Sequence, residues 1–399
     1  MRRRTGVVRP LAVLGASCLV ALACSGGGGR TTAPTTAPTT APKDAPTDAS
    51  AVSLKGLCPD KVVLQTDWFP ESEHGFSYQL IGTGGTTDKG KGTYTGPLLD
   101  PNTGRPTGVS LEIRAGGPFI GFQPPVAQMY SDDSIFVAYA DTADQIRNSK
   151  KLPTVAVMAP LNRTPLILMY DPTRYHFTSL ADIGKSGAKV LYFEGVVFMD
   201  YLVSKGLINK SQLDGSYDGS PARFVADNGA DVQQGFATRE PYEYEHTITG
   251  WMKPVKYLLV DDAGYKIYQS ALVVRPETIT RYGDCLRRLV PLFQAAMVKY
   301  LARPQPVNDQ LLDIVRTLAT SWTLSKGGSQ FTVDQMKSLK IVANSPDGSY
   351  GSFDDARVQT VIDEVLPIFK NQHLDSYKPD VKPSDLVTNQ FLNTSVKLP

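Results

Sequence analysis

An unusual mixture of side chains follows the apolar run "KVVL". The stretch "QTDWFPESEHG", residues 65–75, combines aromatic, acidic and imidazole groups within eleven positions. Trp68 and Phe69 offer flat apolar faces that suit stacking against a heteroaromatic ring. His74 donates or accepts a hydrogen bond, depending on its tautomer. The stretch therefore indicates a loop that binds a small ring compound.

The acids of this stretch have separate predicted roles. Glu71 and Glu73 are acceptors for an exocyclic amine, whereas Asp67 is expected to fix the loop by accepting backbone N–H groups. Two residues also have structural alternatives. Trp68 is alternatively an anchor in the core, and His74 a cap of the helix that begins at the next glycine.

Three further segments supply candidate binding residues. In "RAGGPFIGFQPP", Gly117 lets the backbone approach a ligand closely and Gln123 recognises a polar edge, with a tight strand-to-helix turn as the alternative. "YFEGVVF" places Glu194 at a strand end before a helix. "ATREPYEYEH" adds an acid and two aromatic rings, or else a solvated amphipathic helix, with the candidates Glu240, Tyr242 and Tyr244.

The charges of these segments bear on the class of ligand. A helix N-terminus after Glu194 would favour an anion, but the carboxylate itself repels one. This favours a neutral or amine-bearing ligand, while Arg239 keeps an anionic ligand open as the alternative.

Apolar runs alternate with helical patterns along the chain. Helices are predicted at residues 198–208 and 231–246, and beyond residues 271–302 the pattern is mainly helical through residue 372. This alternation predicts an α/β protein with largely parallel sheets. The strand-like runs are residues 61–69, 109–117, 134–140, 154–160, 165–171, 188–195, 222–227, 256–265 and 270–276.

The order of these elements predicts two α/β lobes with a ligand cleft between them. Residues 58–171 form the first part of lobe 1, residues 172–266 form lobe 2, and residues 267–399 return to lobe 1 and add C-terminal helices. Ligands favour such clefts and the carboxyl ends of strands. The glycine-rich residues 82–113 are expected to form a loop or hairpin.

"LQTDWFPESEHG" resembles the first-strand signature of the NMT1/THI5-like solute-binding proteins, in which Asp-Trp-x-Pro precedes a histidine. "GFATREPYEYE" resembles a second-lobe segment of that family, and the resemblance covers roughly residues 60–300. It implies the type II periplasmic-binding-protein fold, with two lobes joined by a hinge. It also implies a receptor that delivers a thiamine-pyrimidine-like or related vitamin precursor to the permease and ATPase of an ABC importer. More distant relatives bind nitrate, alkanesulfonates or taurine. The chain lacks the cysteine cluster of the family's pyrimidine synthases, so that activity is not expected.

The N-terminus predicts export. Residues 1–23 combine four arginines, a short apolar run and small residues, the layout of a signal peptide. "Ala-Leu-Ala-Cys24" resembles a lipobox, which implies lipidation of Cys24 and anchoring at the extracytoplasmic face of the cell membrane. An ordinary cleaved signal is the alternative. Residues 24–57, rich in Thr, Ala and Pro, form the predicted tether.

The two remaining cysteines, Cys58 and Cys285, predict a disulfide in an exported chain, with two buried thiols as the alternative. No metal-ligand spacing is present, and neither a metal nor a cofactor is expected.

Charge and motifs limit the remaining classes of function. The chain carries a formal charge of +2, and the four arginines of residues 1–23 leave −2 on the rest. Nucleic-acid binding is therefore not expected. No nucleophile elbow or phosphate-binding loop occurs, so an enzyme is not expected. We expect a monomeric transport receptor, and a ligand-sensing lipoprotein is the alternative.

Overall fold

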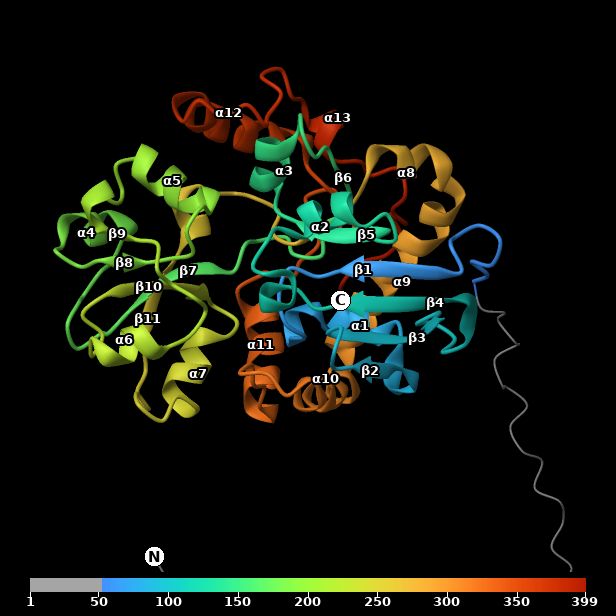
Figure 1. Ribbon diagram of the computed structural model, residues 1–399, viewed down its shortest axis with the longest axis horizontal. Coiled ribbons are helices and arrows are strands. Elements are labelled where there is room, and N and C mark those ends of the chain that lie inside the picture. The colour runs from blue at the N-terminus through green and yellow to red at the C-terminus, as the bar shows by residue number, and fades with distance from the viewer. Residues whose placement is uncertain (1–51) are drawn as a thin grey trace, which may run out of the picture. The chain divides into compact units, whose positions relative to one another are not determined.

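The computed structural model describes residues 52–399. The predicted signal peptide, the predicted lipidation site Cys24 and all but the last residues of the predicted tether lie outside this range. Strands and helices alternate along the described chain, which confirms the α/β class (Figure 1). Among residues 52–399, no helix is both long enough and apolar enough to cross a bilayer.

The first sheet has seven strands. Only β1 pairs with parallel neighbours on both sides, namely β4 and β5, and the remaining pairs are antiparallel. The sheet is therefore mixed, whereas a largely parallel one was predicted. In spatial order the strands are β2 (Thr86–Asp88), β3 (Thr93–Leu99), β4 (Pro106–Arg114), β1 (Lys61–Gln65), β5 (Val137–Ala140), β12 (Ala271–Val274) and β6 (Val155–Met158).

Apart from the exposed Lys61, strand β1 is buried on both faces, as its central apolar run, residues 62–64, requires. Val62 and Leu64 belong to one hydrophobic core, and Val63 belongs to another, because successive side chains point to opposite faces. The first core includes α1 (Gly75–Gln79), α9 (Gly283–Ala302) and α10 (Gln305–Leu318), and the second includes α2 (Pro125–Ser131), α3 (Thr142–Asn148) and α12 (Asp355–Asn371).

The glycine-rich residues 82–113 form the edge of the first sheet. A short 3-10 helix, η2 (Gly82–Gly84), leads into the antiparallel strands β2, β3 and β4. The hairpin interpretation of this segment is therefore correct.

The second sheet is also mixed. Its strands, in spatial order, are β11 (Lys256–Leu259), β7 (Leu166–Tyr170), β10 (Val232–Phe236), β8 (Val190–Leu191) and β9 (Leu213–Asp214). We call the part built on the first sheet lobe 1 and the part built on the second sheet, residues 166–259, lobe 2. The boundaries at residues 172 and 266 stay predictions. The helices between these strands are α4 (Leu180–Lys185), α5 (Val197–Ser204), η4 (Lys210–Gln212), α6 (Ala222–Ala226) and α7 (Glu240–His246).

Two predictions within lobe 2 were wrong. Residues 222–227, predicted as a strand, form helix α6, in which an Arg223–Asp227 ion pair spans one turn. The helix predicted for residues 231–246 begins as strand β10, and only its second part is helical. The strand was missed because a polar glutamine does not indicate a buried strand. In the structure Gln233 is fully buried, and its side chain donates a hydrogen bond to the hydroxyl of Tyr244.

Two chain segments cross between the sheets, residues 159–165 and 260–270. The second contains the 3-10 helix η5 (Val260–Ala263). Arg357 of α12 donates to carbonyls of both, at 2.7 Å to Asn162, 2.6 Å to Lys266 and 2.6 Å to Ile267. Its guanidinium also lies 3.9 Å from the centre of the Tyr268 ring. Arg357 therefore ties the two crossings together.

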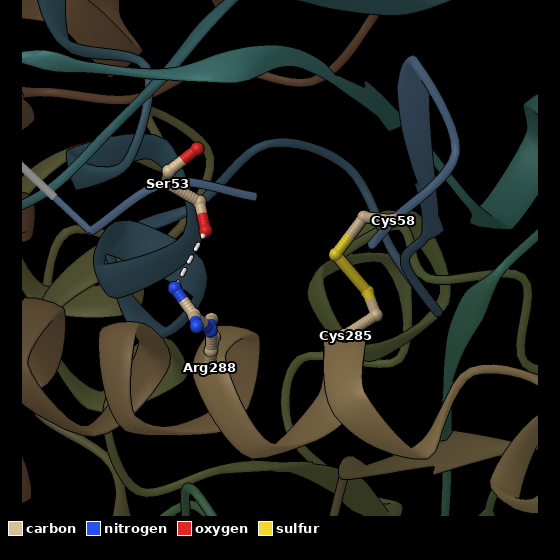
Figure 2. The surroundings of a disulfide bond; sticks show 4 residues. All are labelled: Ser53, Cys58, Cys285 and Arg288. Atoms are coloured by element: carbon tan, nitrogen blue, oxygen red, sulfur yellow. Dashed lines mark hydrogen bonds between the residues drawn. A yellow bond between two sulfur atoms is a disulfide. The ribbon is translucent and has the colours of Figure 1, made fainter. Parts of the chain in front are cut away.

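The C-terminal part is helical, as predicted. It begins with α8 (Pro276–Arg281) and α9 and ends with α11 (Lys326–Ser338), α12 and α13 (Pro383–Leu386). The predicted disulfide is confirmed, since Cys58 before β1 is bonded to Cys285 at the start of α9. Figure 2 shows a second link between the same segments, a hydrogen bond from Arg288 to the carbonyl of Ser53.

Candidate ligand-binding cleft

A cleft of about 530 Å³ lies between the lobes. Asp67, just beyond β1, and Asp141, directly after β5, both line it. It therefore opens at the carboxyl ends of two neighbouring parallel strands, where ligands of open α/β sheets bind. Its volume is within the range of about 300–1,000 Å³ that is usual for small-molecule sites.

Most of the predicted binding residues meet at this cleft. Four do not line it: Phe69 stacks on Trp322, Tyr242 packs against Phe331, Tyr244 is buried beside Gln233, and Glu73 is turned away. The predicted residues that do line the cleft are Trp68, Glu71, His74, Gly117, Gln123, Glu194 and Glu240.

The loop after β1 is held by the end of β4. The backbone N–H of Gly116 donates to the carbonyl of Trp68 at 2.8 Å, and that of Gly117 donates to Asp67 at 3.1 Å. A Cβ atom at Gly116 would lie 2.4 Å from the Asp67 backbone, so no larger residue fits. The lack of a side chain at Gly116 therefore lets the backbone after β4 pack closely against the loop that carries Trp68.

His74 lies among three acids. Its Nε2 is 3.1 Å from Asp67 Oδ1 and 3.4 Å from Glu71 Oε1. Burial alone would lower the pKa of His74, but Glu71, Asp67 and Glu73 raise it to about 9. His74 is therefore protonated at neutral pH. It occupies the N-cap position of α1, but its side chain makes no cap hydrogen bond.

Asp67 is tied to lobe 1 through its side chain. Its Oδ2 accepts a 2.6 Å hydrogen bond from the hydroxyl of Ser270, rather than the backbone N–H groups that were predicted. Burial would raise the pKa of Asp67, yet His74 and Ser270 together lower it. Asp67 therefore remains ionised and is the principal partner of His74.

Glu73 points to lobe 2 and does not line the cleft. It is buried and accepts a hydrogen bond from the hydroxyl of Thr238, which follows β10. Burial and the nearby charge of Glu71 raise the pKa of Glu73 to about 8. The residue therefore forms a direct link between the lobes.

Aromatic rings from both lobes meet at Trp68. Its ring lies next to two glycines with positive φ, Gly117 of lobe 1 and Gly219 of lobe 2, and Cβ atoms there would come within 3.1 Å of it. The ring centre of Phe193 is 5.6 Å away, and that of Phe122 is 5.9 Å away. Trp68 thus forms part of an aromatic wall that spans both lobes.

Trp322 completes this wall and was missed by the sequence analysis. It lies between α10 and α11, its ring stacks on Phe69 at 5.0 Å, and its indole N–H donates to Pro70 at 3.1 Å. The guanidinium of Arg239 lies 3.6 Å from the ring centre and donates to the carbonyl of Thr323. A tryptophan in the polar stretch "TSWTLS" was the available signal.

The polar corner formed by the start of α3 was also missed. Asp141 accepts from Gln269 at 2.7 Å and from the Ser270 backbone at 2.9 Å, and burial raises its pKa. Arg147 reaches across the cleft and donates to the carbonyl of Gly195 at 2.7 Å. Asp141 directly follows a predicted strand, and that position was the available signal.

Residues 52–399 contain no cluster of side chains suited to a metal ion. No group of three or more His, Cys, Asp or Glu side chains in that range is arranged to hold a metal ion. The lining of the cleft supplies hydrogen-bonding, charged and aromatic side chains.

No protein-family model matches the chain, and no curated protein matches it. Solved structures do match. One is the ligand-binding component of an ABC-type import system from Staphylococcus aureus with zinc bound, with a TM-score of 0.52 and 14% identity, covering 84% of this chain and all of that one. Another is the alkanesulfonate-binding protein SsuA from Xanthomonas axonopodis pv. citri bound to MOPS, with a TM-score of 0.51, 13% identity and coverage of 83% and 98%.

A third is a putative sulfonate-binding SsuA from Methylobacillus flagellatus, with a TM-score of 0.51, 13% identity and coverage of 83% and 92%. At these identities the likeness shows the fold. The chain has the two-sheet fold of periplasmic binding proteins, as predicted.

Proposed function

We propose that this protein is a solute-binding receptor of an ABC importer and that it holds a small heteroaromatic ligand between its lobes. The observation that carries the proposal is the cleft of about 530 Å³, which both lobes line with aromatic and hydrogen-bonding groups. Solved structures of the same fold include ligand-binding components of import systems. Closure of the lobes on the ligand would present a new surface to the permease and ATPase.

The ligand of this proposal is a thiamine-pyrimidine-like compound or a related vitamin precursor. Trp68 and Phe193 supply ring faces, and Glu71 supplies an acceptor for an exocyclic amine. Gln123 and Glu240 supply further polar contacts from either lobe. Membership of the NMT1/THI5-like family is part of the same proposal.

Two alternatives have support. The first is an anionic ligand, because the two SsuA proteins of similar fold are named as sulfonate-binding proteins. Arg147 and Arg239, which line this cleft, also favour an anion. Both guanidiniums, however, already donate to backbone carbonyls, those of Gly195 and Thr323. A ligand-sensing lipoprotein would use the same cleft without a permease.

The proposal includes the cellular setting. We place the protein at the extracytoplasmic face of the membrane, anchored through lipid on Cys24, as a monomer without catalytic activity. The Cys58–Cys285 disulfide supports an oxidising compartment.

A thermal-shift screen of the purified protein tests the proposal. The panel contains 4-amino-5-hydroxymethyl-2-methylpyrimidine, riboflavin, taurine and nitrate. A ligand at 100 times its dissociation constant adds about 2.7 kcal/mol to stability. We expect a shift with the pyrimidine or riboflavin only. A shift only with taurine or nitrate would establish the anionic alternative.

Variants then test the placement of the site. Trp68→Ala and His74→Ala are expected to weaken binding of the stabilising compound about tenfold or more, as for buried anchor residues. His246→Ala is the matched control, because His246 is exposed on α7 outside the cleft lining. Unchanged affinity in both cleft variants would show that the site lies elsewhere.

A further inference from the structure

The cleft has an excess of acidic side chains. Its cationic residues are His74, Arg147 and Arg239. Its acidic residues are twice as many: Asp67, Glu71, Asp141, Asp144, Glu194 and Glu240. With every carboxylate ionised and His74 protonated, the lining carries a net charge of −3. Burial raises the pKa values of Glu71, Asp141, Asp144 and Glu240, so a cation bound beside them would favour this fully ionised state. A small enclosed site with this charge favours a positively charged ligand.

The three cationic groups are already engaged by the protein. His74 lies between Asp67 and Glu71. Arg147 donates to a carbonyl of the opposite lobe, and Arg239 covers the Trp322 ring while donating to the neighbouring carbonyl. An anionic ligand would have to compete for each of them.

Carboxylates also occupy the helix ends that face the cleft. Asp141 is the N-cap residue of α3, Glu240 is the first residue of α7, and Glu194 lies two residues before the N-cap of α5. The partial positive charge of a helix N-terminus attracts anions. In this protein, carboxylate side chains lie at these helix ends, and their negative charge opposes the binding of an anionic ligand there.

Glu71 supplies an independent observation. Its exposed fraction is 7%, it lines the cleft, and no group within residues 52–399 donates a hydrogen bond to its carboxylate. Its nearest charged partner, His74 Nε2, is 3.4 Å away. A buried carboxylate is normally hydrogen-bonded. The open oxygen of Glu71 therefore has the character of a ligand contact.

The electrostatics of Glu71 agree with this role. Burial raises its pKa to about 7, against the opposing effect of His74, and the carboxylates of Asp67 and Glu240 act in the same direction as burial. An ammonium group beside it would favour the ionised form.

We propose, on the basis of the proposed receptor function, that the ligand is an organic cation whose ammonium group is held by Glu71 and the carboxylates around it. The rings of Trp68 and Phe193, which both line the cleft, then face the rest of the ligand and add cation–π attraction. Asp144 extends the acidic lining toward α3, since its carboxylate makes no hydrogen bond within residues 52–399 and its nearest cation, Arg147, is 3.8 Å away.

Titration calorimetry of the full-length protein with two matched pairs of probes tests the inference. The first pair is 4-amino-5-aminomethyl-2-methylpyrimidine and its 5-hydroxymethyl analogue, which differ in an ammonium against a hydroxyl group. The second is choline and its neutral isostere 3,3-dimethyl-1-butanol. The ammonium of the first pair donates a hydrogen bond to a carboxylate, which is worth more than a neutral hydrogen bond. The trimethylammonium of choline has no N–H and gains Coulombic and cation–π attraction that its isostere lacks. We therefore expect the cation of at least one pair to bind about tenfold tighter or better.

Variants locate the effect. Glu71→Gln and Asp144→Asn are expected to weaken binding of the cation several-fold more than binding of its neutral analogue, so that the preference for the cation falls. The matched control is Glu245→Gln, which removes an exposed carboxylate of α7 outside the cleft lining. The wild-type preference is a test in itself, whether or not the variants fold.

The outcomes separate this inference from the proposed function. Equal binding of both pyrimidines with no binding of choline overturns the cation and leaves a heteroaromatic receptor. Tight binding of choline alone supports the cation and overturns the heteroaromatic ligand. Silence from all four probes, or tighter binding of nitrate or of Zn²⁺ than of either cation, overturns the inference.

Discussion

The Cys58–Cys285 disulfide closes a loop of 227 residues that contains the whole of lobe 2. In the chain-entropy model, a cross-link over such a loop restricts the unfolded chain by on the order of 5 kcal/mol. Domains of ordinary stability unfold with about 5–15 kcal/mol. The disulfide is therefore expected to supply a large part of the free energy of unfolding.

The Cys58→Ser/Cys285→Ser double variant measures this contribution. Guanidinium unfolding should show a loss of about 5 kcal/mol relative to the oxidised wild type, and dithiothreitol should lower the wild type to a similar value. The slope of free energy against denaturant should increase, because an unfolded chain without the cross-link exposes more surface.

Arg288→Ala is the matched control. It removes the other link between the same two segments, an exposed hydrogen bond to Ser53 (Figure 2). The expected loss is about 1 kcal/mol or less. A loss below about 2 kcal/mol in the double variant would refute the loop-entropy reasoning.

Three further predictions concern links between or within the lobes. Glu73→Gln keeps an acceptor for Thr238 but cannot ionise. Because the pKa of Glu73 is raised from 4.5 to about 8 in the folded protein, wild-type stability falls as the pH rises between these values. The melting temperatures of the variant and the wild type should therefore diverge in this range, and parallel pH profiles would contradict the prediction. Arg357→Ala should cost about 3 kcal/mol in urea unfolding, because three carbonyls lose a charged donor, and a loss below about 1 kcal/mol would contradict the tie between crossings. Gly219 has a φ of +85°, and a Cβ atom added there would lie 3.1 Å from the Trp68 ring. Gly219→Ala should therefore lower the melting temperature, whereas an unchanged value would show that this contact is dispensable.

The sequence located the cleft through the loop after β1, but it did not determine which side chains face it. Beyond the strand the chain turns into the 3-10 helix η1 (Ser72–His74) and then α1. Glu71 and His74 are three positions apart and therefore lie on one face, toward the cleft. Glu73 points to Thr238 instead, and Phe69 stacks on Trp322.

The rest of the site depends on contacts between distant segments. Trp322 and Arg239 meet although they are far apart in sequence, and no local pattern indicates that pairing. Asp141 was within reach of prediction, because it directly follows a strand beside β1. Local composition misled the analysis where glutamines are buried in β10, since such a strand lacks apolar alternation.

The chain contains three tryptophans, and two of them, Trp68 and Trp322, line the cleft. The third, Trp251, packs against Phe224 in the core of lobe 2. Intrinsic fluorescence is thus a built-in optical reporter. A ligand that enters the cleft, or a separation of Arg239 from Trp322, will alter the emission of two indoles against the steady background of the third. Binding rates are therefore measurable by stopped flow on the unlabelled protein.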